Sequence, residues 1–148
     1  MKISWNQYFI ELAQLVSKKG SCIKRQVGAV IIKDNMIIST GYNGTPRGVR
    51  NCNEGGCERC SNPANTSGMN YHECLCVHAE ENAIVQAAYQ GISTKGATLF
   101  TSLCPCLYCA KSIANAGIKK VFYNEEFTMD EATIRLFNEA GVQIERYV

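Results

Sequence analysis

Nine cysteines in a chain of 148 residues constrain the fold more than any other feature of the sequence. So many thiols must be paired, bound to metal or buried, and their odd number argues against a framework made only of disulfides. The N-terminus has no basic stretch followed by an apolar segment, and no apolar run approaches the roughly 18 residues of a membrane span. We therefore expect reduced thiols and metal sites in a cytoplasmic protein that does not contact membranes.

The composition is that of one ordinary globular domain. Hydrophobic residues make up 46% of the chain and charged residues 19%, and apolar side chains are spread along residues 1–148. A chain of this length fits a single core. The net charge of +2 comes without a run of Lys and Arg that could follow a nucleic-acid backbone. We expect no nucleic-acid partner, and a small anionic substrate suits this balance.

The first third of the chain predicts a helix and a hairpin. Ser4 can cap a helix with its hydroxyl, and the apolar side chains that follow it recur at helical spacing. Residues 27–33 and 36–42 are two β-rich runs joined by the short polar link Asp34-Asn35. These runs should pair antiparallel, with the helix covering the sheet.

The second half of the chain alternates helices and strands, which predicts partly parallel pairing. We expect a helix from Val77, a strand at 97–101, a helix with Pro105 in its first turn ending near Gly117, strands at 119–123 and 142–148, and a helix at about 130–140. Residues 43–76 between the halves have little periodicity. An irregular segment of this length in a compact domain is normally functional or cross-linked.

Two short motifs together carry the chemistry. The first is His78-Ala79-Glu80, which matches H-x-E. The second lies at residues 105–109, where Pro105, Cys106 and Cys109 match P-C-x-x-C. Together they make the signature of zinc deaminases. Either motif alone is weak, since C-x-x-C also occurs in redox pairs and an isolated histidine is usually structural. Their joint occurrence, in this order and at predicted helix starts, indicates a catalytic zinc site.

The spacing gives each residue of this signature a separate task. Cys106 and Cys109 are three residues apart, so both sulfurs can reach one ion, and the positive end of a helix dipole favours their thiolate forms. His78 would be the third ligand, which leaves the fourth tetrahedral position for water, as in catalytic zinc sites. Glu80 would take a proton from that water and deliver protons to the ring nitrogen and to departing ammonia. Glu81 is expected to be a solvated carboxylate.

Further segments extend the resemblance over nearly the whole chain. They are W-N-Q-Y-F at 5–9, V-G-A-V-I at 27–31, G-Y-N-G-T-P-R at 41–47, H-A-E-E-N-A-I at 78–84, P-C-L-Y-C at 105–109 and A-G-I-K-K-V at 116–121. With these segments the sequence resembles the deoxycytidylate (dCMP) deaminases of the cytidine deaminase superfamily. The resemblance implies a cytidine-deaminase-like α/β fold with three layers, α/β/α, around a five-stranded mixed sheet.

The same resemblance implies a function and its regulation. The reaction would be hydrolytic conversion of dCMP to dUMP, which supplies thymidylate synthesis. Members of the family are commonly homohexamers, activated by dCTP with Mg²⁺ and inhibited by dTTP. By the family's pattern, Asn43 would hydrogen-bond the deoxyribose 3′-hydroxyl, and the loop at 41–48, with Gly44 and Arg47 as candidate contacts to the allosteric nucleotide, would lie close to phosphate. A simple glycine-rich turn is the alternative for that loop.

Four cationic side chains could hold a phosphate, because arginine offers forked donors to its oxygens. They are Lys24, Arg25, Arg47 and Arg50. Arg25 is our candidate for the substrate. Solvation at the surface is the default role for all four.

The cysteines outside the catalytic motif predict a second, structural zinc. The candidates are Cys22, Cys52, Cys57, Cys60, Cys74 and Cys76, since the ends of a hairpin bring Cys22 and Cys52 together and the other four have short metal-ligand spacings. Six thiols exceed the needs of one tetrahedral ion, so either two remain free or bridging sulfurs hold two ions. His72 could also compete, and unligated core cysteines are the alternative. Cys104 is expected to be a small buried residue.

Two other classes of function remain open at this stage. One is a deaminase for guanine, a riboflavin precursor or adenosine in transfer RNA, although a transfer-RNA enzyme should carry more basic surface than a net charge of +2. The other is a non-enzymatic zinc module that binds nucleic acid. Such a module has no need of Glu80.

Overall fold

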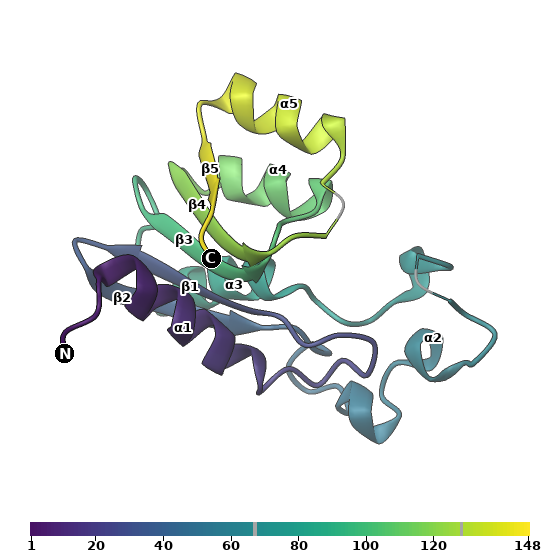
Figure 1. The fold of residues 1–148 in the computed structure, drawn as a ribbon. Helices are drawn as coiled ribbons and strands as arrows, with labels where there is room; N and C mark the ends of the chain where they lie inside the picture. The colour runs from purple at the N-terminus through teal and green to yellow at the C-terminus, as the bar shows by residue number, and fades with distance from the viewer. Residues whose placement is uncertain (67, 128) are drawn as a thin grey trace.

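Five strands form one mixed sheet in the computed structural model, which describes residues 1–66, 68–127 and 129–148 (Figure 1). The strands are β1 (Gly28–Lys33), β2 (Met36–Tyr42), β3 (Thr98–Leu103), β4 (Lys120–Glu125) and β5 (Gln143–Arg146). Their order across the sheet is β2-β1-β3-β4-β5, and β1 is antiparallel to both β2 and β3, whereas β3, β4 and β5 are parallel. The five-stranded mixed sheet and the partly parallel pairing are confirmed.

Helices cover both faces of this sheet (Figure 1). On one face lies α1 (Trp5–Ser17), where Phe9 packs on Phe100 of β3 with the ring centroids 5.3 Å apart. The opposite face carries α3 (Ala79–Gln90), α4 (Leu107–Asn115) and α5 (Glu131–Ala140). Each face of the sheet is buried under its own layer, so the apolar residues form two clusters where a single core was expected. The three-layer architecture is confirmed.

Local sequence signals explain the first elements. The hydroxyl of Ser4 accepts a hydrogen bond from the backbone N–H of Gln7 at 3.1 Å and so caps α1, as expected. Asp34 and Asn35 both have positive φ, 53° and 59°, as a two-residue turn between right-twisted strands requires. The predicted hairpin of β1 and β2 is confirmed.

Some predicted boundaries are wrong by a few residues. Pro105 precedes α4 instead of lying in its first turn, because the N-cap of that helix is Cys106, whose extended backbone directs its sulfur toward His78. Strand β5 ends at Arg146, short of Val148, because the parallel register with β4 stops at the pair Tyr123 and Arg146.

The segment between β2 and α3 extends away from the sheet (Figure 1). Among the residues of this segment that the structure describes, the helical elements are short: η1 (Cys52–Glu54), α2 (Glu58–Ser61) and η2 (Tyr71–Glu73). The base of the segment is closed by a backbone bridge: Gly44 donates to Val77 at 3.1 Å and Val77 donates back at 2.7 Å. In the described residues, no helix combines the length and the apolar character needed to cross a bilayer.

Helix α3 approaches the sheet unusually closely at Gly41 of β2. A Cβ added at Gly41 would lie 2.3 Å from the carbonyl oxygen of Ala79 and 2.3 Å from the backbone nitrogen of Ala83. Both neighbours are backbone atoms of α3, so the helix itself would have to move. The absence of a side chain at Gly41 therefore sets the position of the helix that follows His78.

We predict that Gly41→Ala lowers the free energy of unfolding by about 1–3 kcal/mol, the usual cost of overpacking a core. Urea titration followed by circular dichroism measures this change. The matched control is Thr40→Ala, because Thr40 is the exposed neighbour on the same strand and can lose only strand propensity, a scale that spans about 1 kcal/mol. Equal stability of the two variants would contradict the close approach of α3.

Candidate active site

Two chain turns bring the signature residues together at the starts of α3 and α4. His78 is the N-cap of α3, and the Gly44–Val77 bridge fixes the backbone immediately before it. Cys106 is the N-cap of α4, which follows directly from the end of β3. Because both helices pack on the same face of the sheet, their first residues face each other.

The three predicted zinc ligands form one compact group. Nδ1 of His78 lies 3.4 Å from Sγ of Cys106 and 3.3 Å from Sγ of Cys109, and all three atoms lie within 4.8 Å of one another. A tetrahedral zinc with bonds of about 2.0–2.1 Å to nitrogen and 2.3 Å to sulfur separates such atoms by about 3.5 Å. The donor set therefore fits zinc, with three protein ligands and a fourth position for a small molecule.

The two thiols differ in their readiness to ionise. Hydrogen bonding from Cys109 lowers the pKa of Cys106 to about 4, and His78 acts in the same direction. The contact with ionised Cys106, together with burial, raises the pKa of Cys109. Cys106 is therefore the first thiolate of the pair, and a cation placed between the sulfurs is what allows the second to form.

Glu80 is the buried carboxyl of the site. It lies in the first turn of α3 and is only 4% exposed, and burial raises its pKa to about 7. The adjacent Glu81 points elsewhere, since its carboxylate lies 3.4 Å from the hydroxyl of Tyr108, which can donate to it. Helical geometry thus separates the two glutamates, and only Glu80 is enclosed with the metal ligands.

Asn43, the predicted contact to the sugar, is 8% exposed and already holds the loop before β1. Its Oδ1 accepts from the backbone N–H of Val27 at 2.8 Å, and its Nδ2 donates to the carbonyl oxygen of Arg25 at 2.6 Å. The amide oxygen has a second lone pair, so a further donor can be accommodated. Contact with a sugar hydroxyl stays a prediction.

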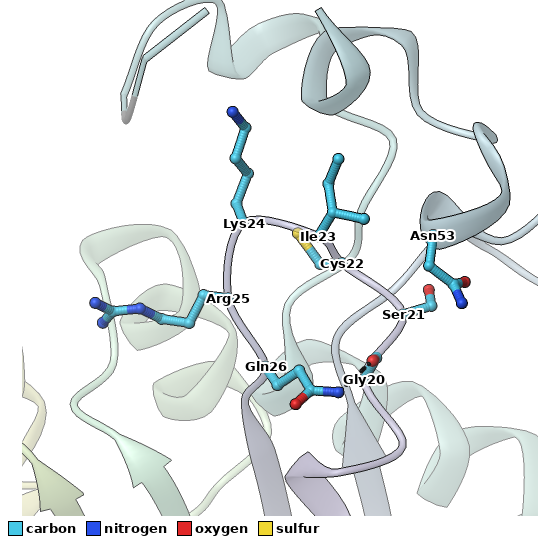
Figure 2. Close-up of a pocket in the computed structure, with 8 residues that line it drawn as sticks. All are labelled: Gly20, Ser21, Cys22, Ile23, Lys24, Arg25, Gln26 and Asn53. Atoms are coloured by element: carbon cyan, nitrogen blue, oxygen red, sulfur yellow. Dashed lines mark hydrogen bonds between the residues drawn. The ribbon is translucent and has the colours of Figure 1, made fainter. Parts of the chain in front are cut away.

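A hollow of about 490 Å³ lies beside that loop, between residues 20–26 and Asn53 (Figure 2). Lys24 and Arg25 project from its rim in different directions. The ammonium of Lys24 donates to the carbonyl oxygen of Asn65 at 3.2 Å, whereas the guanidinium of Arg25 lies 5.0 Å from the centre of the Phe127 ring. A role for Arg25 with substrate phosphate remains a prediction.

Three other predicted nucleotide contacts lie in different surroundings. Arg47 lies over the ring of Tyr89, 4.5 Å from its centre, and so sits against α3. Arg50 donates to the carbonyl oxygen of Gly55 at 3.0 Å and braces a turn. Gly44 forms the bridge at the base of the insertion. The assignment of Gly44 and Arg47 to an allosteric nucleotide is thus still a prediction.

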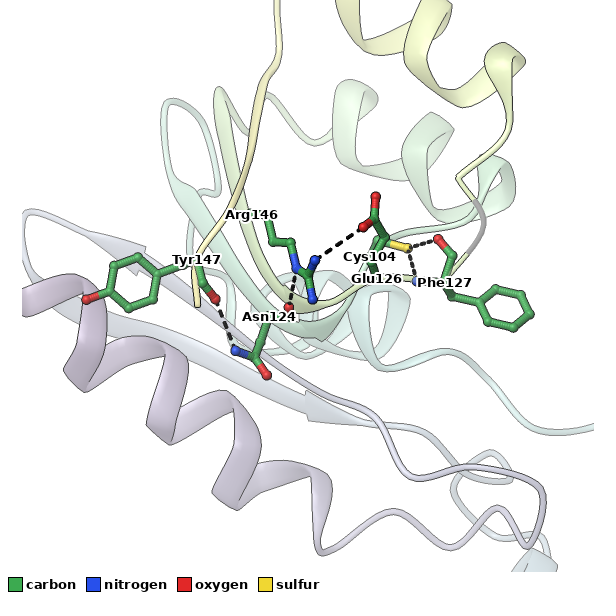
Figure 3. A network of polar contacts seen from close by, with 6 residues as sticks. All are labelled: Cys104, Asn124, Glu126, Phe127, Arg146 and Tyr147. Carbon is green, nitrogen blue, oxygen red and sulfur yellow. Dashed lines mark hydrogen bonds and ion pairs between the residues drawn. The ribbon is translucent and has the colours of Figure 1, made fainter.

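The sequence did not predict the contact between Cys104, in the turn that joins β3 to α4, and the loop after β4 (Figure 3). Cys104 is buried, as expected, and its thiol donates to the carbonyl oxygen of Phe127 at 2.9 Å and accepts from the Phe127 N–H at 3.2 Å. Arg146 of β5 ties the same loop down through Glu126 at 3.2 Å. Phe127 lies outside every motif. It comes close to Cys104 because both residues follow the ends of the paired strands β3 and β4.

The other six cysteines lie together at the end of the hairpin and in the insertion, away from the histidine site. All nine cysteines of the chain are free thiols. The six form a cluster that consists of Cys22, Cys52, Cys57, Cys60, Cys74 and Cys76. The predicted competitor His72 belongs to neither metal-ligating group of this cluster, because its exposed ring pairs with Glu73.

Residues 3–125 match the family described as the cytidine and deoxycytidylate deaminase zinc-binding region, and the chain belongs to this family. Among individual proteins, it is 48% identical over 98% of its length to the deoxycytidylate deaminase of Schizosaccharomyces pombe and 42% identical over 99% to that of Saccharomyces cerevisiae. The crystal structure of the dCMP deaminase of cyanophage S-TIM5 in complex with dCMP and dUMP matches with a TM-score of 0.80 at 32% identity, covering 99% of both chains.

The chain spans less than half the length of the two fungal relatives, 44% and 46%. It spans nearly the whole of the cyanophage enzyme. The shared part therefore includes the complete fold of that smaller protein.

We predict that Cys109→Ser removes one zinc ion per chain, because it deletes one of three ligands at the site. Elemental analysis of purified protein, referenced to protein concentration, measures the loss relative to the unsubstituted chain. Cys104→Ser is the matched control, since Cys104 is another buried thiol near the start of α4, and its sulfur bonds the backbone of Phe127 and is not part of the ligand group. Unchanged zinc in Cys109→Ser would contradict the site.

Proposed function

We propose that the chain is a zinc-dependent hydrolase that converts dCMP and water to dUMP and ammonia. The observation that carries this proposal is the buried carboxyl of Glu80 beside a group of three candidate zinc ligands, which leaves one tetrahedral position without a protein ligand. A purely structural zinc site has four protein ligands and does not require an enclosed carboxyl. The substrate choice is supported by the deoxycytidylate deaminases among the relatives and by the cyanophage enzyme solved with dCMP and dUMP.

Glu80 moves the protons in this mechanism. Zinc held by His78, Cys106 and Cys109 would supply Lewis acidity that makes water a better nucleophile at neutral pH. The Glu80 carboxylate accepts a proton from that water and delivers it to the ring nitrogen beside the amino-bearing carbon. By then the water oxygen has bonded to that carbon. Glu80 carries the remaining proton of this oxygen to the amino nitrogen, the C–N bond breaks with loss of ammonia, and the C–O bond becomes the carbonyl of dUMP. A carboxyl with a pKa of about 7 can transfer protons in both directions at neutral pH.

We predict that Glu80→Gln keeps the zinc content and lowers kcat by at least about 10²- to 10⁴-fold, the usual contribution of general acid–base catalysis. Ammonia release and elemental analysis on the same preparations measure both quantities. Glu81→Gln is the control, because it makes the same chemical change one residue away, and we expect its kcat to stay within a few-fold of the parent. Full activity in Glu80→Gln would rule out this mechanism.

The finer features of the proposal concern regulation and assembly. We propose activation by dCTP with Mg²⁺, inhibition by dTTP, a homohexamer and a cytoplasmic enzyme that supplies dUMP for thymidylate synthesis. Their support is the resemblance to the dCMP deaminase family. Gly44 and Arg47 are the proposed contacts to the effector nucleotide, and Asn43 and Arg25 to the substrate. Binding of structural zinc at the six-cysteine cluster is also part of the proposal.

We predict that dCMP is deaminated in preference to cytidine, guanine, a riboflavin precursor and adenosine in transfer RNA. Chromatographic separation of products after incubation with each compound tests the substrate. A dCMP saturation curve measured with and without dCTP plus Mg²⁺, and with dTTP, tests the regulation. Preference for an unphosphorylated nucleoside or for RNA would overturn the substrate, whereas a hyperbolic curve unmoved by either nucleotide would remove only the regulation.

A further inference from the structure

The six thiols of the insertion fall into two overlapping groups of four. Cys22, Cys52, Cys60 and Cys76 have sulfurs that all lie within 4.8 Å of one another, and the same holds for Cys57, Cys60, Cys74 and Cys76. The two groups share Cys60 and Cys76. Each group alone has the number of ligands of one tetrahedral structural zinc site.

The sulfur separations match those around a tetrahedral metal. Sγ of Cys60 lies 4.0 Å from that of Cys22 and 3.8 Å from that of Cys74, and Cys57 and Cys74 are 4.0 Å apart. Tetrahedral zinc bonds to sulfur of about 2.3 Å place two sulfurs about 3.8 Å apart. A disulfide would need about 2.05 Å. These three pairs of thiols are thus not joined as disulfides and have the spacing of sulfurs that share an ion.

We propose that this cluster binds two zinc ions, with the sulfurs of Cys60 and Cys76 bridging both. Each ion would have one of the two groups as its four ligands. Two tetrahedral ions need eight bonds to sulfur, and six thiolates form eight when two of them bridge. The arrangement therefore uses every thiol in the cluster, whereas a single ion would leave two cysteines over. This site is independent of the proposed deamination.

The surroundings supply donors and positive charge to a sulfur-rich anionic site. Six thiolates outweigh the charge of two zinc ions, and the buried guanidinium of Arg59, only 5% exposed, lies with Nη1 3.9 Å from Sγ of Cys60. Its other nitrogens donate to the carbonyl oxygens of Met69 and Thr66. In the described part of the chain, Arg59 has no carboxylate partner. The backbone N–H of Leu75 donates to Sγ of Cys57 at 3.3 Å, a further stabilising contact.

The backbone of the insertion is shaped to bring the sulfurs together. Between Cys52 and Cys57 the chain reverses at Gly55, whose φ is 85°. A Cβ added at Gly56 would lie 1.7 Å from the carbonyl oxygen of Arg50, so the reversal requires glycine there as well. The buried side chains of Cys52 and Cys57 then point into one cluster. Because of this tight reversal, Cys52 and Cys57 belong to different ligand groups although they are only five residues apart.

Native mass spectrometry of the full chain counts the ions. We expect three zinc ions per chain, one at His78, Cys106 and Cys109 and two in the cluster. The variant Cys109→Ser should then retain two, which isolates the cluster from the catalytic site and is independent of whether the chain deaminates dCMP. One ion or none in that variant would overturn the two-ion cluster, as would the mass of an iron–sulfur centre.

Bridging is tested by loading the Cys109→Ser variant with ¹¹³Cd²⁺. Two cadmium ions that share sulfurs should give two resonances, split by scalar coupling between the metals. Adding Cys60→Ser should abolish that coupling and lower the cluster to one ion or none, whereas Cys104→Ser, outside both groups, should leave coupling and ion count unchanged. Two uncoupled resonances would overturn the bridge. Circular dichroism of each variant reports whether the sheet and helices remain folded.

Discussion

The candidate active site depends on the packing of α3 and α4, which brings the first residues of the two helices together. Ala79 and Ala83 of α3 and Ala110 of α4 share one buried cluster with the sheet, and these small side chains let the two helices lie deep against it. With the helices fixed at this depth, the caps His78 and Cys106 face each other. A ligand group split between distant segments thus becomes as rigid as the core beneath it.

The same packing separates the two glutamates of α3. Residues next to each other on a helix point about 100° apart, so placing Ala79 and Glu80 against the core turns Glu81 outward. Glu80 is consequently removed from water, and its carboxyl becomes harder to ionise than an exposed one. Burial, not a neighbouring anion, is the main cause. The proton-carrying property proposed for Glu80 therefore follows from the position of its helix.

Most of the fold, and the grouping of His78 with Cys106 and Cys109, could be predicted because the motifs that carry them are short and local. The His78 and Cys106 motifs lie at helix starts, and the Asp34-Asn35 turn specifies a hairpin by itself. Contacts that no motif or hairpin marks were beyond reach: nothing in the sequence links Cys104 to Phe127. The spacing of six cysteines likewise gives the number of thiols but not their distances, so the sharing of Cys60 and Cys76 emerges only in three dimensions.

The bridge between Gly44 and Val77 also has a consequence for how related proteins can differ. It closes residues 45–76 into an excursion whose two ends are joined by paired backbone hydrogen bonds just before His78. Doubling the length of a closed flexible loop costs only about 0.6 kcal/mol in entropy. Insertions, deletions or different ligands within this excursion can therefore accumulate during evolution while the backbone position of His78 is inherited unchanged.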